Sequence, residues 1–139
     1  MPFLRRKKAS AFDAEIHEAI VLACTDMTSA DERLSDALGR AREAGDRTAV
    51  VACLKALSVI ASVTGREDGR WLAICRELVL ADPENPSNWI TLGNAEESTG
   101  ALERAAEAYT KAIDLTGDPR TRQLVRHFLD RIRSTMPAE

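Results

Sequence analysis

Apolar residues along this chain recur every three or four positions, and no segment alternates between apolar and polar residues. A spacing of three to four places apolar side chains on one face of an α-helix, whereas alternation would indicate a β-strand. Glycines interrupt the pattern at intervals, as at Gly45, Gly65 and Gly100. Because helices often end at glycine and accept proline in their first turn, these residues divide the pattern into separate helices. The sequence therefore predicts an all-α protein of seven helices.

Side chains that can cap a helix start set most of the predicted boundaries. Ser10 with Asp13 opens the first helix, whose apolar positions continue to Met27, and Ser29 with Glu32 opens the second. The predicted starts of the remaining helices are Asp46, Asp68, Asn85, Ala101 and Pro119. Because the linkers are short, we expect consecutive helices to be antiparallel neighbours.

The segment from Pro86 to Pro119, PSNWITLGNAEESTGALERAAEAYTKAIDLTGDP, combines large and small apolar residues at fixed spacings. The residues that carry this pattern are Trp89, Leu92, Gly93, Ala105, Tyr109 and Ala112. Their order resembles the tetratricopeptide (TPR) repeat, which has a period of about 34 residues. Small residues let two helices approach closely, and the large ones fill the space between them. Such a pair needs neighbours to cover its apolar faces, so the resemblance implies a stack of helix pairs.

The resemblance is weaker toward the N-terminus. The third and fourth predicted helices form a degenerate unit, in which Pro83 stands six residues before Trp89, and the first two helices form a still weaker pair. Residues 38–57 also parallel residues 92–113, which would instead pair the second helix with the third. Within the best unit, Glu96 stands where the family usually has an aromatic residue. The resemblance implies a right-handed, TPR-like α-solenoid of about three antiparallel helix pairs with a C-terminal capping helix.

Charge is distributed unevenly along the chain. A basic cluster near the N-terminus, in a chain of formal net charge −3, consists of Arg5, Arg6, Lys7 and Lys8. We expect residues 1–9 to form a basic flexible tail and residues 10–135 to form a single helical domain. Acidic residues interrupt the apolar stretch after the cluster, and no run of 18 apolar residues occurs, which argues against a signal peptide and a transmembrane helix. These features favour a cytoplasmic protein, and we interpret the excess of Arg over Lys as typical of a GC-rich bacterium.

Residues able to perform chemistry are few and dispersed. Cys24, Cys53 and Cys75 each fall within an apolar helical pattern, so we expect three reduced, buried thiols. His17 and His127 are far apart in the sequence, and neither has a nucleophile or second ligand at helical spacing. Catalytic and metal sites need several converging groups. The sequence therefore predicts no enzyme activity, no cofactor and no metal site.

The TPR resemblance also implies where a partner would bind, because the first helix of each pair lines the concave face of such solenoids. The candidate partner-binding residues are Ala56, Ile60, Val63, Ser87, Ile90, Asn94 and Glu97. Some family members clamp a terminal carboxylate with Lys and Asn. Asn94 fits this role, but no Lys or Arg accompanies it in the set, so we expect no such clamp. The apolar members predict a groove for an apolar peptide or an amphipathic helix; alternatively, the N-terminal helices cover them as core.

The resemblance predicts a non-catalytic protein–protein interaction module, such as an adaptor, assembly factor or dedicated chaperone, that binds a segment of another protein. A second possibility is a self-associating structural protein that forms a homodimer through the apolar face. A third is weak, salt-sensitive binding to an anionic surface or nucleic acid through the basic termini. A loose helix-turn-helix spacing over residues 41–54 adds little, because the segment AVVACLKAL offers almost no polar side chains to read bases. Nucleic acid is therefore the less favoured partner.

Overall fold

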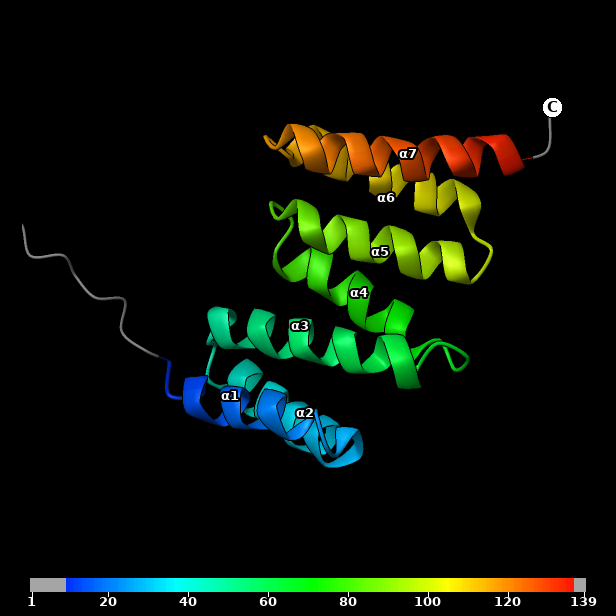
Figure 1. The fold of residues 1–139 in the computed structure, drawn as a ribbon. Helices are drawn as coiled ribbons and strands as arrows, with labels where there is room; N and C mark the ends of the chain where they lie inside the picture. Colours follow the sequence, from blue (N-terminus) through cyan, green and yellow to red (C-terminus); the bar gives the residue numbers. More distant parts are fainter. Residues whose placement is uncertain (1–9, 137–139) are drawn as a thin grey trace, which may run out of the picture. The chain divides into compact units, whose positions relative to one another are not determined.

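The computed structural model describes residues 10–136 as helices joined by short turns (Figure 1). No strand occurs among these residues, so the predicted all-α class is confirmed. The seven helices found there are α1 (Asp13–Leu22), α2 (Met27–Glu43), α3 (Arg47–Thr64), α4 (Arg70–Ala81), α5 (Pro86–Ser98), α6 (Leu102–Leu115) and α7 (Pro119–Thr135). The basic cluster at residues 5–8 and the predicted tail of residues 1–9 lie outside the described residues.

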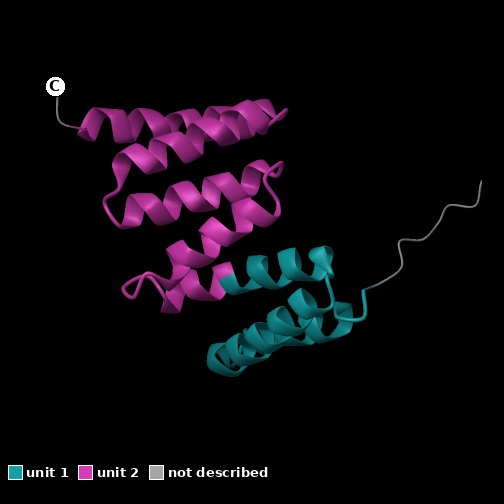
Figure 2. Ribbon diagram, turned by 180° about the vertical axis from the view of Figure 1, so that it is seen from behind, with its two compact units in different colours: residues 1–57 teal, residues 58–139 magenta. Residues whose placement is uncertain are grey.

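The chain divides into two compact units, residues 1–57 and residues 58–139, which Figure 2 colours teal and magenta. The division falls within α3, so the first part of this helix belongs to unit 1 and the remainder to unit 2. In unit 1, α1 packs against α2. In unit 2, α4, α5, α6 and α7 pack in chain order, each against the next. The prediction of one domain over residues 10–135 stays a prediction.

Local hydrogen bonds explain why several predicted helix starts agree with the structure. Asp46 Oδ1 accepts a hydrogen bond from the N–H of Ala49 (3.1 Å) at the start of α3. Asn85 Oδ1 accepts one from the N–H of Ser87 (3.0 Å), and α5 then begins at Pro86. Each bond satisfies an N–H that has no partner within the first turn of its helix. These two predicted caps are confirmed.

The boundary between α1 and α2 differs from the prediction. The first helix ends at Leu22 instead of continuing to Met27, and the cap of the second is Asp26 rather than Ser29. The Asp26 carboxylate accepts hydrogen bonds from both the N–H (3.0 Å) and the hydroxyl (2.6 Å) of Ser29. These bonds lower the pKa of Asp26 below its ordinary value. An ionised carboxylate is a stronger acceptor than a hydroxyl, which explains why Asp26 takes the capping position.

The core of unit 1 consists mainly of small and branched aliphatic side chains. Its buried residues on α1 and α2 are Ile16, Ala19, Ala30, Leu34, Ala37, Leu38 and Ala41. At the edge of the unit, Ser10 Oγ donates a hydrogen bond to Asp46 Oδ2 (2.6 Å). Arg40 on α2 pairs with Glu15 on α1 and with Asp36 one turn earlier. This unit is therefore held by close packing of small residues with ion pairs at its surface.

The α5–α6 pair of unit 2 is shaped by a contact between a glycine and an aromatic ring. A Cβ added to Gly93 would lie 2.4 Å from Cε1 of Tyr109, so only glycine fits here. Tyr109 is fully buried in a cluster with Ala105, Ala112, Val125 and Ile132. Between the two helices Gly100 has a φ of +82°, a left-handed conformation that favours glycine and ends α5.

Helix α3 is long and apolar. Its 18 residues have a mean hydropathy of 1.5, enough by length and composition to cross a membrane, and 39% of them are buried. This is weak evidence for a membrane span, because core helices of soluble proteins pass the same test. The helix also carries polar residues within its length, including Lys55, Ser58 and Ser62.

Candidate partner-binding groove

A groove of about 590 Å³ lies within unit 2. Its walls come from the C-terminal part of α3, the turn after it, the start of α4 and one face of α5. The lining residues are Ser58, Val59, Ser62, Arg66, Trp71, Thr91, Asn94, Glu97 and Ser98. The lining is thus richer in hydroxyl and charged groups than the apolar groove expected from the sequence.

The hydroxyl groups of the groove mostly donate to their own helices. Ser62 Oγ donates to the carbonyl of Val59 (2.6 Å), Thr91 Oγ1 to that of Ser87 (3.0 Å) and Ser98 Oγ to that of Ala95 (2.7 Å). A hydroxyl that donates in this way keeps oxygen lone pairs that can accept. These side chains therefore offer acceptors to a bound segment.

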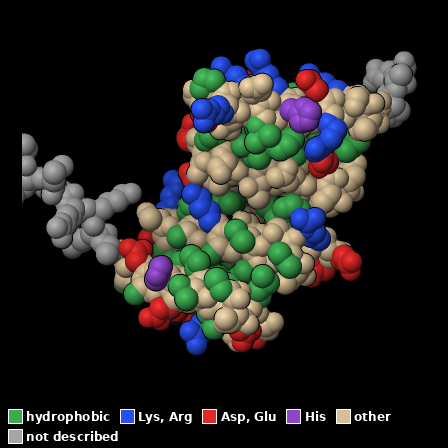
Figure 3. Space-filling view, viewed as in Figure 1, with side chains coloured by type: hydrophobic (Ala, Val, Ile, Leu, Met, Phe, Trp, Pro, Cys, Tyr) green, Lys and Arg blue, Asp and Glu red, His purple; other side chains and the backbone are tan. Residues whose placement is uncertain are grey.

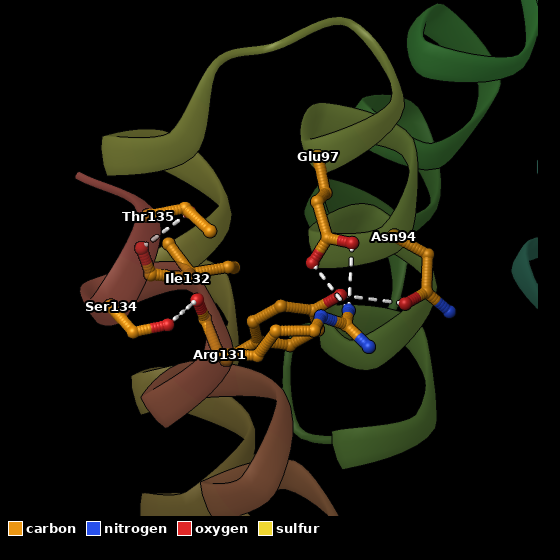
Figure 4. Close-up of polar contacts among 7 residues, drawn as sticks. Asn94, Glu97, Arg131, Ile132, Ser134 and Thr135 are labelled. Carbon is orange, nitrogen blue, oxygen red and sulfur yellow. Dashed lines mark hydrogen bonds and ion pairs between the residues drawn. The ribbon is translucent and has the colours of Figure 1, made fainter.

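Asn94 and Glu97 are held in place by the two helices that follow α5 (Figure 4). Tyr109 of α6 donates its hydroxyl hydrogen to Asn94 Oδ1 (2.6 Å). Arg131 of α7 donates through one terminal nitrogen to both oxygens of Glu97 (2.8 and 2.7 Å). Among residues 10–136, the amide nitrogen of Asn94 makes no hydrogen bond, so it remains available to a ligand.

The environment of Tyr109 keeps its hydroxyl protonated. Burial, assisted by the negative charge of Glu97, raises the pKa of Tyr109 to about 12, while the positive charge of Arg131 opposes the rise. A protonated phenol donates a hydrogen bond, so its link to Asn94 persists across the neutral range. The result is a fixed orientation for the Asn94 amide at the groove.

The two tryptophans differ in how their indole nitrogens are satisfied. Trp89 Nε1 donates to the carbonyl oxygen of Pro83 (2.8 Å). Trp71, which is 6% exposed, has no hydrogen-bond partner for Nε1 within the described part of the chain. Leaving a buried donor unpaired costs about 1–3 kcal/mol. Trp71 therefore lines the groove with a ring whose buried N–H has no acceptor among the described residues.

Arg66 lies beside this unpaired donor. Its guanidinium carbon is 4.8 Å from the centroid of the Trp71 ring, which is within the range of a cation–π contact. Arg66 Nε also donates to the carbonyl of Ser62 at the end of α3. The turn after α3 thus brings a positive charge to the same end of the groove as the Trp71 indole.

The structure brings only part of the predicted partner-binding set to this groove. Asn94 and Glu97 line it. Val63 and Ser87 are exposed outside its lining, and Ala56 lies in unit 1. Ile60 is 3% exposed, and Ile90 packs against the cluster around Tyr109. Whether each of the seven contacts a partner stays a prediction, but the burial of Ile60 and the packing of Ile90 suit core positions.

Arg66 and Trp71 are groove residues that the sequence reasoning missed. Arg66 follows the end of α3 at Thr64, whereas the candidate set consists of residues on helical faces. The unpaired N–H of Trp71 depends on tertiary packing, which the spacing of apolar residues does not reveal. Arg66 lines the same groove as Asn94, although it is not one of the seven candidate positions, and the absence of a carboxylate clamp stays a prediction.

The cysteines differ in environment. Cys53 and Cys75 are buried and free, as expected, but Cys24 is exposed because it follows the end of α1 at Leu22. Burial raises the pKa of Cys75 to about 12, so this thiol stays protonated and unreactive at neutral pH. Within residues 10–136, no three His, Cys, Asp or Glu side chains come together in a way that could hold a metal ion.

Comparisons of this chain with models of protein families, with curated proteins and with solved structures find no match. The relation to the tetratricopeptide family therefore remains the resemblance of the 86–119 segment.

Proposed function

We propose that this protein is a non-catalytic protein–protein interaction module that binds an extended segment of another protein in the unit 2 groove. The observation that carries the proposal is the buried, unpaired indole N–H of Trp71 at the wall of an open groove. The Asn94 amide supplies a second unused donor from α5. An extended peptide presents backbone carbonyls at regular intervals, and these would accept from both donors.

The proposed partner segment is polar as well as apolar. Val59 and the Trp71 ring offer apolar contact, while Arg66 favours a carbonyl-rich or acidic group at its end of the groove. The Ser62 and Thr91 oxygens would accept from backbone N–H groups of the same segment. This combination suits an adaptor, assembly factor or dedicated chaperone that acts in the bacterial cytoplasm.

We propose in addition that the helices form a TPR-like right-handed solenoid of helix pairs, with α7 as the cap. The Gly93–Tyr109 contact supports this, because it occupies the positions at which the repeat pattern pairs a small residue with an aromatic ring. The packing of α5 against α6 and of α6 against α7 is also what a stacked array requires.

Site-specific crosslinking tests the groove. A photoreactive phenylalanine derivative replaces Ser62, which lines the groove, or Ser134, an exposed serine on α7 outside it. These serines are matched, because each hydroxyl donates to a carbonyl three residues earlier in its own helix. We expect adducts from position 62 whose mapped peptide, made synthetically, also binds the purified protein. Equal adducts from both positions, or a mapped peptide that does not bind, would contradict the proposal.

A loss-of-function variant completes this test. Trp71→Phe keeps an aromatic ring for Arg66 to contact but removes the indole N–H. We expect the mapped peptide to bind this variant about tenfold more weakly, in line with the loss of about 1.4 kcal/mol. Unchanged affinity in a folded Trp71→Phe protein would remove the observation on which the proposal rests.

Self-association is the second candidate function. Val59 and Val63 lie one turn apart on α3 and are 68% and 67% exposed, and hydrophobic side chains are also visible on the face shown in Figure 3. Exposed apolar patches often mark interfaces. Sedimentation of the wild type and of Val63→Glu at several concentrations tests this candidate. A concentration-dependent dimer that Val63→Glu abolishes would favour it, and a monomer throughout would exclude it.

A further inference from the structure

The opposite face of α5 lines a second cavity of about 480 Å³, separate from the groove. Arg76 of α4, Trp89 and Glu96 of α5, and Arg104 and Lys111 of α6 contribute to its wall. The two cavities share no lining residue. A ligand of the second cavity would therefore contact none of the residues that line the groove.

Glu96 is the unusual residue of this cavity, because a carboxylate is rarely buried to this degree without full pairing. Glu96 as a whole is only 3% exposed. Oε1 accepts hydrogen bonds from Nε (3.2 Å) and a terminal nitrogen (3.0 Å) of Arg76. Oε2 is buried as well, and it has no partner among the residues that the structure describes. Glu96 therefore lines the cavity as the partner of Arg76 in an ion pair, with one carboxylate oxygen left without a hydrogen bond.

The rim of the cavity on α6 carries positive charge. Arg104 and Lys111 flank Glu107, with one helical turn on either side. Within residues 10–136, no ion pair of Arg104 or Lys111 is formed. A purely cationic ligand would face these two side chains and Arg76, whereas a purely anionic one would face Glu96 and Glu107. A ligand with one group of each sign meets favourable charges at both positions.

We propose that this cavity binds a small zwitterion of amino-acid size. The ligand's ammonium group pairs with Glu96, which shares the cavity wall with Trp89, and its carboxylate accepts from Arg104 and Lys111. The ring adds a cation–π surface for the ammonium group. A volume of about 480 Å³ falls within the range of small-molecule sites and holds an amino acid together with ordered water.

Free L-leucine is the first probe, because it combines the two charged groups with an apolar side chain that suits Trp89 and Leu92 in the wall. The full chain labelled with ¹⁵N reports binding through its two indole signals. We expect leucine to shift the Trp89 signal and to leave the Trp71 signal in place. Leucinamide, which lacks the carboxylate, and 4-methylpentanoate, which lacks the ammonium group, should each bind at least tenfold more weakly. Equal binding of all three, or no shift at millimolar leucine, would overturn the proposal.

Variants separate the charge of Glu96 from its structural role. Glu96→Gln keeps an acceptor for Arg76, and Glu103→Gln is the matched control, because Glu103 is exposed and outside the cavity. We expect at least tenfold weaker leucine binding for Glu96→Gln and none of this loss for Glu103→Gln. Arg104→Gln with Lys111→Gln changes only exposed side chains and should weaken leucine binding similarly. Unchanged affinity in this double variant, or equal effects of the two glutamate variants, would contradict the proposal. Peptide binding in the groove should survive all of these changes.

Discussion

The helix pairs α1–α2 and α5–α6 are held together in different ways. In α5–α6, the backbone at Gly93 lies against the Tyr109 ring so closely that a single added methyl group would collide with it. In α1–α2, Gly39 also lies within a helix, but an added Cβ would meet nothing within 4 Å. Both pairs consist of consecutive helices that pack together. In unit 2 the helices interlock at Gly93 and Tyr109, whereas in unit 1 they are joined by contacts of small residues. Only the interlocked pair carries the clear repeat-like pattern.

The polar contacts of the two pairs differ in the same way. Arg40 and Glu15 join α1 to α2 at the surface, with side chains 45% and 37% exposed. The hydroxyl of Tyr109, by contrast, comes from a fully buried residue and fixes Asn94 at the groove. Packing in unit 2 therefore orients the amide of a residue that lines the groove, whereas the ion pair of unit 1 joins two side chains at the surface.

Adding one methyl group at Gly93 and at Gly39 should show the largest difference between the two helix pairs. We expect Gly93→Ala to lower the free energy of unfolding by about 2–3 kcal/mol, because the buried Tyr109 ring has no room to move aside. Gly39→Ala should raise it by up to about 1 kcal/mol, because alanine favours helix and the site is open. Urea unfolding followed by circular dichroism measures both. Similar effects of the two variants would contradict the interlocked packing.

Removing the Tyr109 hydroxyl should have an intermediate effect. Tyr109→Phe keeps the ring against Gly93 but loses the hydrogen bond to Asn94, which costs about 1 kcal/mol. It should also weaken peptide binding in the groove, because the Asn94 amide is no longer held. Urea unfolding and peptide titration read the two consequences separately. Wild-type affinity in this variant would show that the orientation of Asn94 does not matter.

High pH should destabilise unit 2 in particular. Tyr109 is the single tyrosine of the chain, and its pKa is raised to about 12 from an ordinary value of 10.0. A raised pKa means that the folded state favours the neutral phenol, so its contribution is complete below pH 10 and is lost as the pH rises toward 12. Tyrosinate absorbance and amide hydrogen exchange follow ionisation and opening. Ionisation near pH 10 in the folded protein would contradict the burial of this ring.

Low pH should destabilise unit 1 more than unit 2. Hydrogen bonds lower the pKa of Asp26 and Asp46 in unit 1 and of Asp118 in unit 2 below the ordinary value. A lowered pKa stabilises the folded state above pH 3.8, and this contribution is lost as the pH falls through the lowered value. Hydrogen exchange between pH 5 and 2 should therefore show α2 opening before α6. The reverse order would refute the prediction.

Removing the exposed ion pairs should change the stability of the protein least. Arg40→Ala and Arg131→Ala each break a contact between side chains that are substantially exposed to water, where solvent screens the charges. We expect both to shift the unfolding midpoint by less than Tyr109→Phe does. Arg131→Ala has a second consequence, because it frees Glu97 at the groove, and a peptide titration at moderate salt would detect it.

Local chemistry explains which features the sequence predicted. The caps at Asp46 and Asn85 depend on bonds to residues two or three positions away, so the sequence alone identifies them. Between α1 and α2, Asp26 and Ser29 are both good caps, and only their mutual hydrogen bonds decide between them. With Asp26 as the cap of α2, the first helix ends at Leu22 instead of Met27, and Cys24 lies exposed between the two helices.

The candidate groove could be predicted only in part for the same reason. Asn94 and Glu97 follow from the periodicity of α5, because their face lies opposite to Leu92. Arg66 reaches the groove through the turn after α3, and the unpaired nitrogen of Trp71 depends on what surrounds its ring. Neither a turn conformation nor the absence of a tertiary acceptor has a signature in the spacing of apolar residues.

The two indole N–H signals test the central proposal most directly. Trp71 lines the groove and has an unpaired N–H, whereas Trp89 already donates to Pro83 and lines the other cavity. The crosslink-mapped peptide is titrated into ¹⁵N-labelled protein. If the segment binds in the groove, the Trp71 signal moves downfield as it gains an acceptor, and the Trp89 signal stays in place. Saturable peptide binding that leaves the Trp71 signal unchanged would contradict the groove as the partner site.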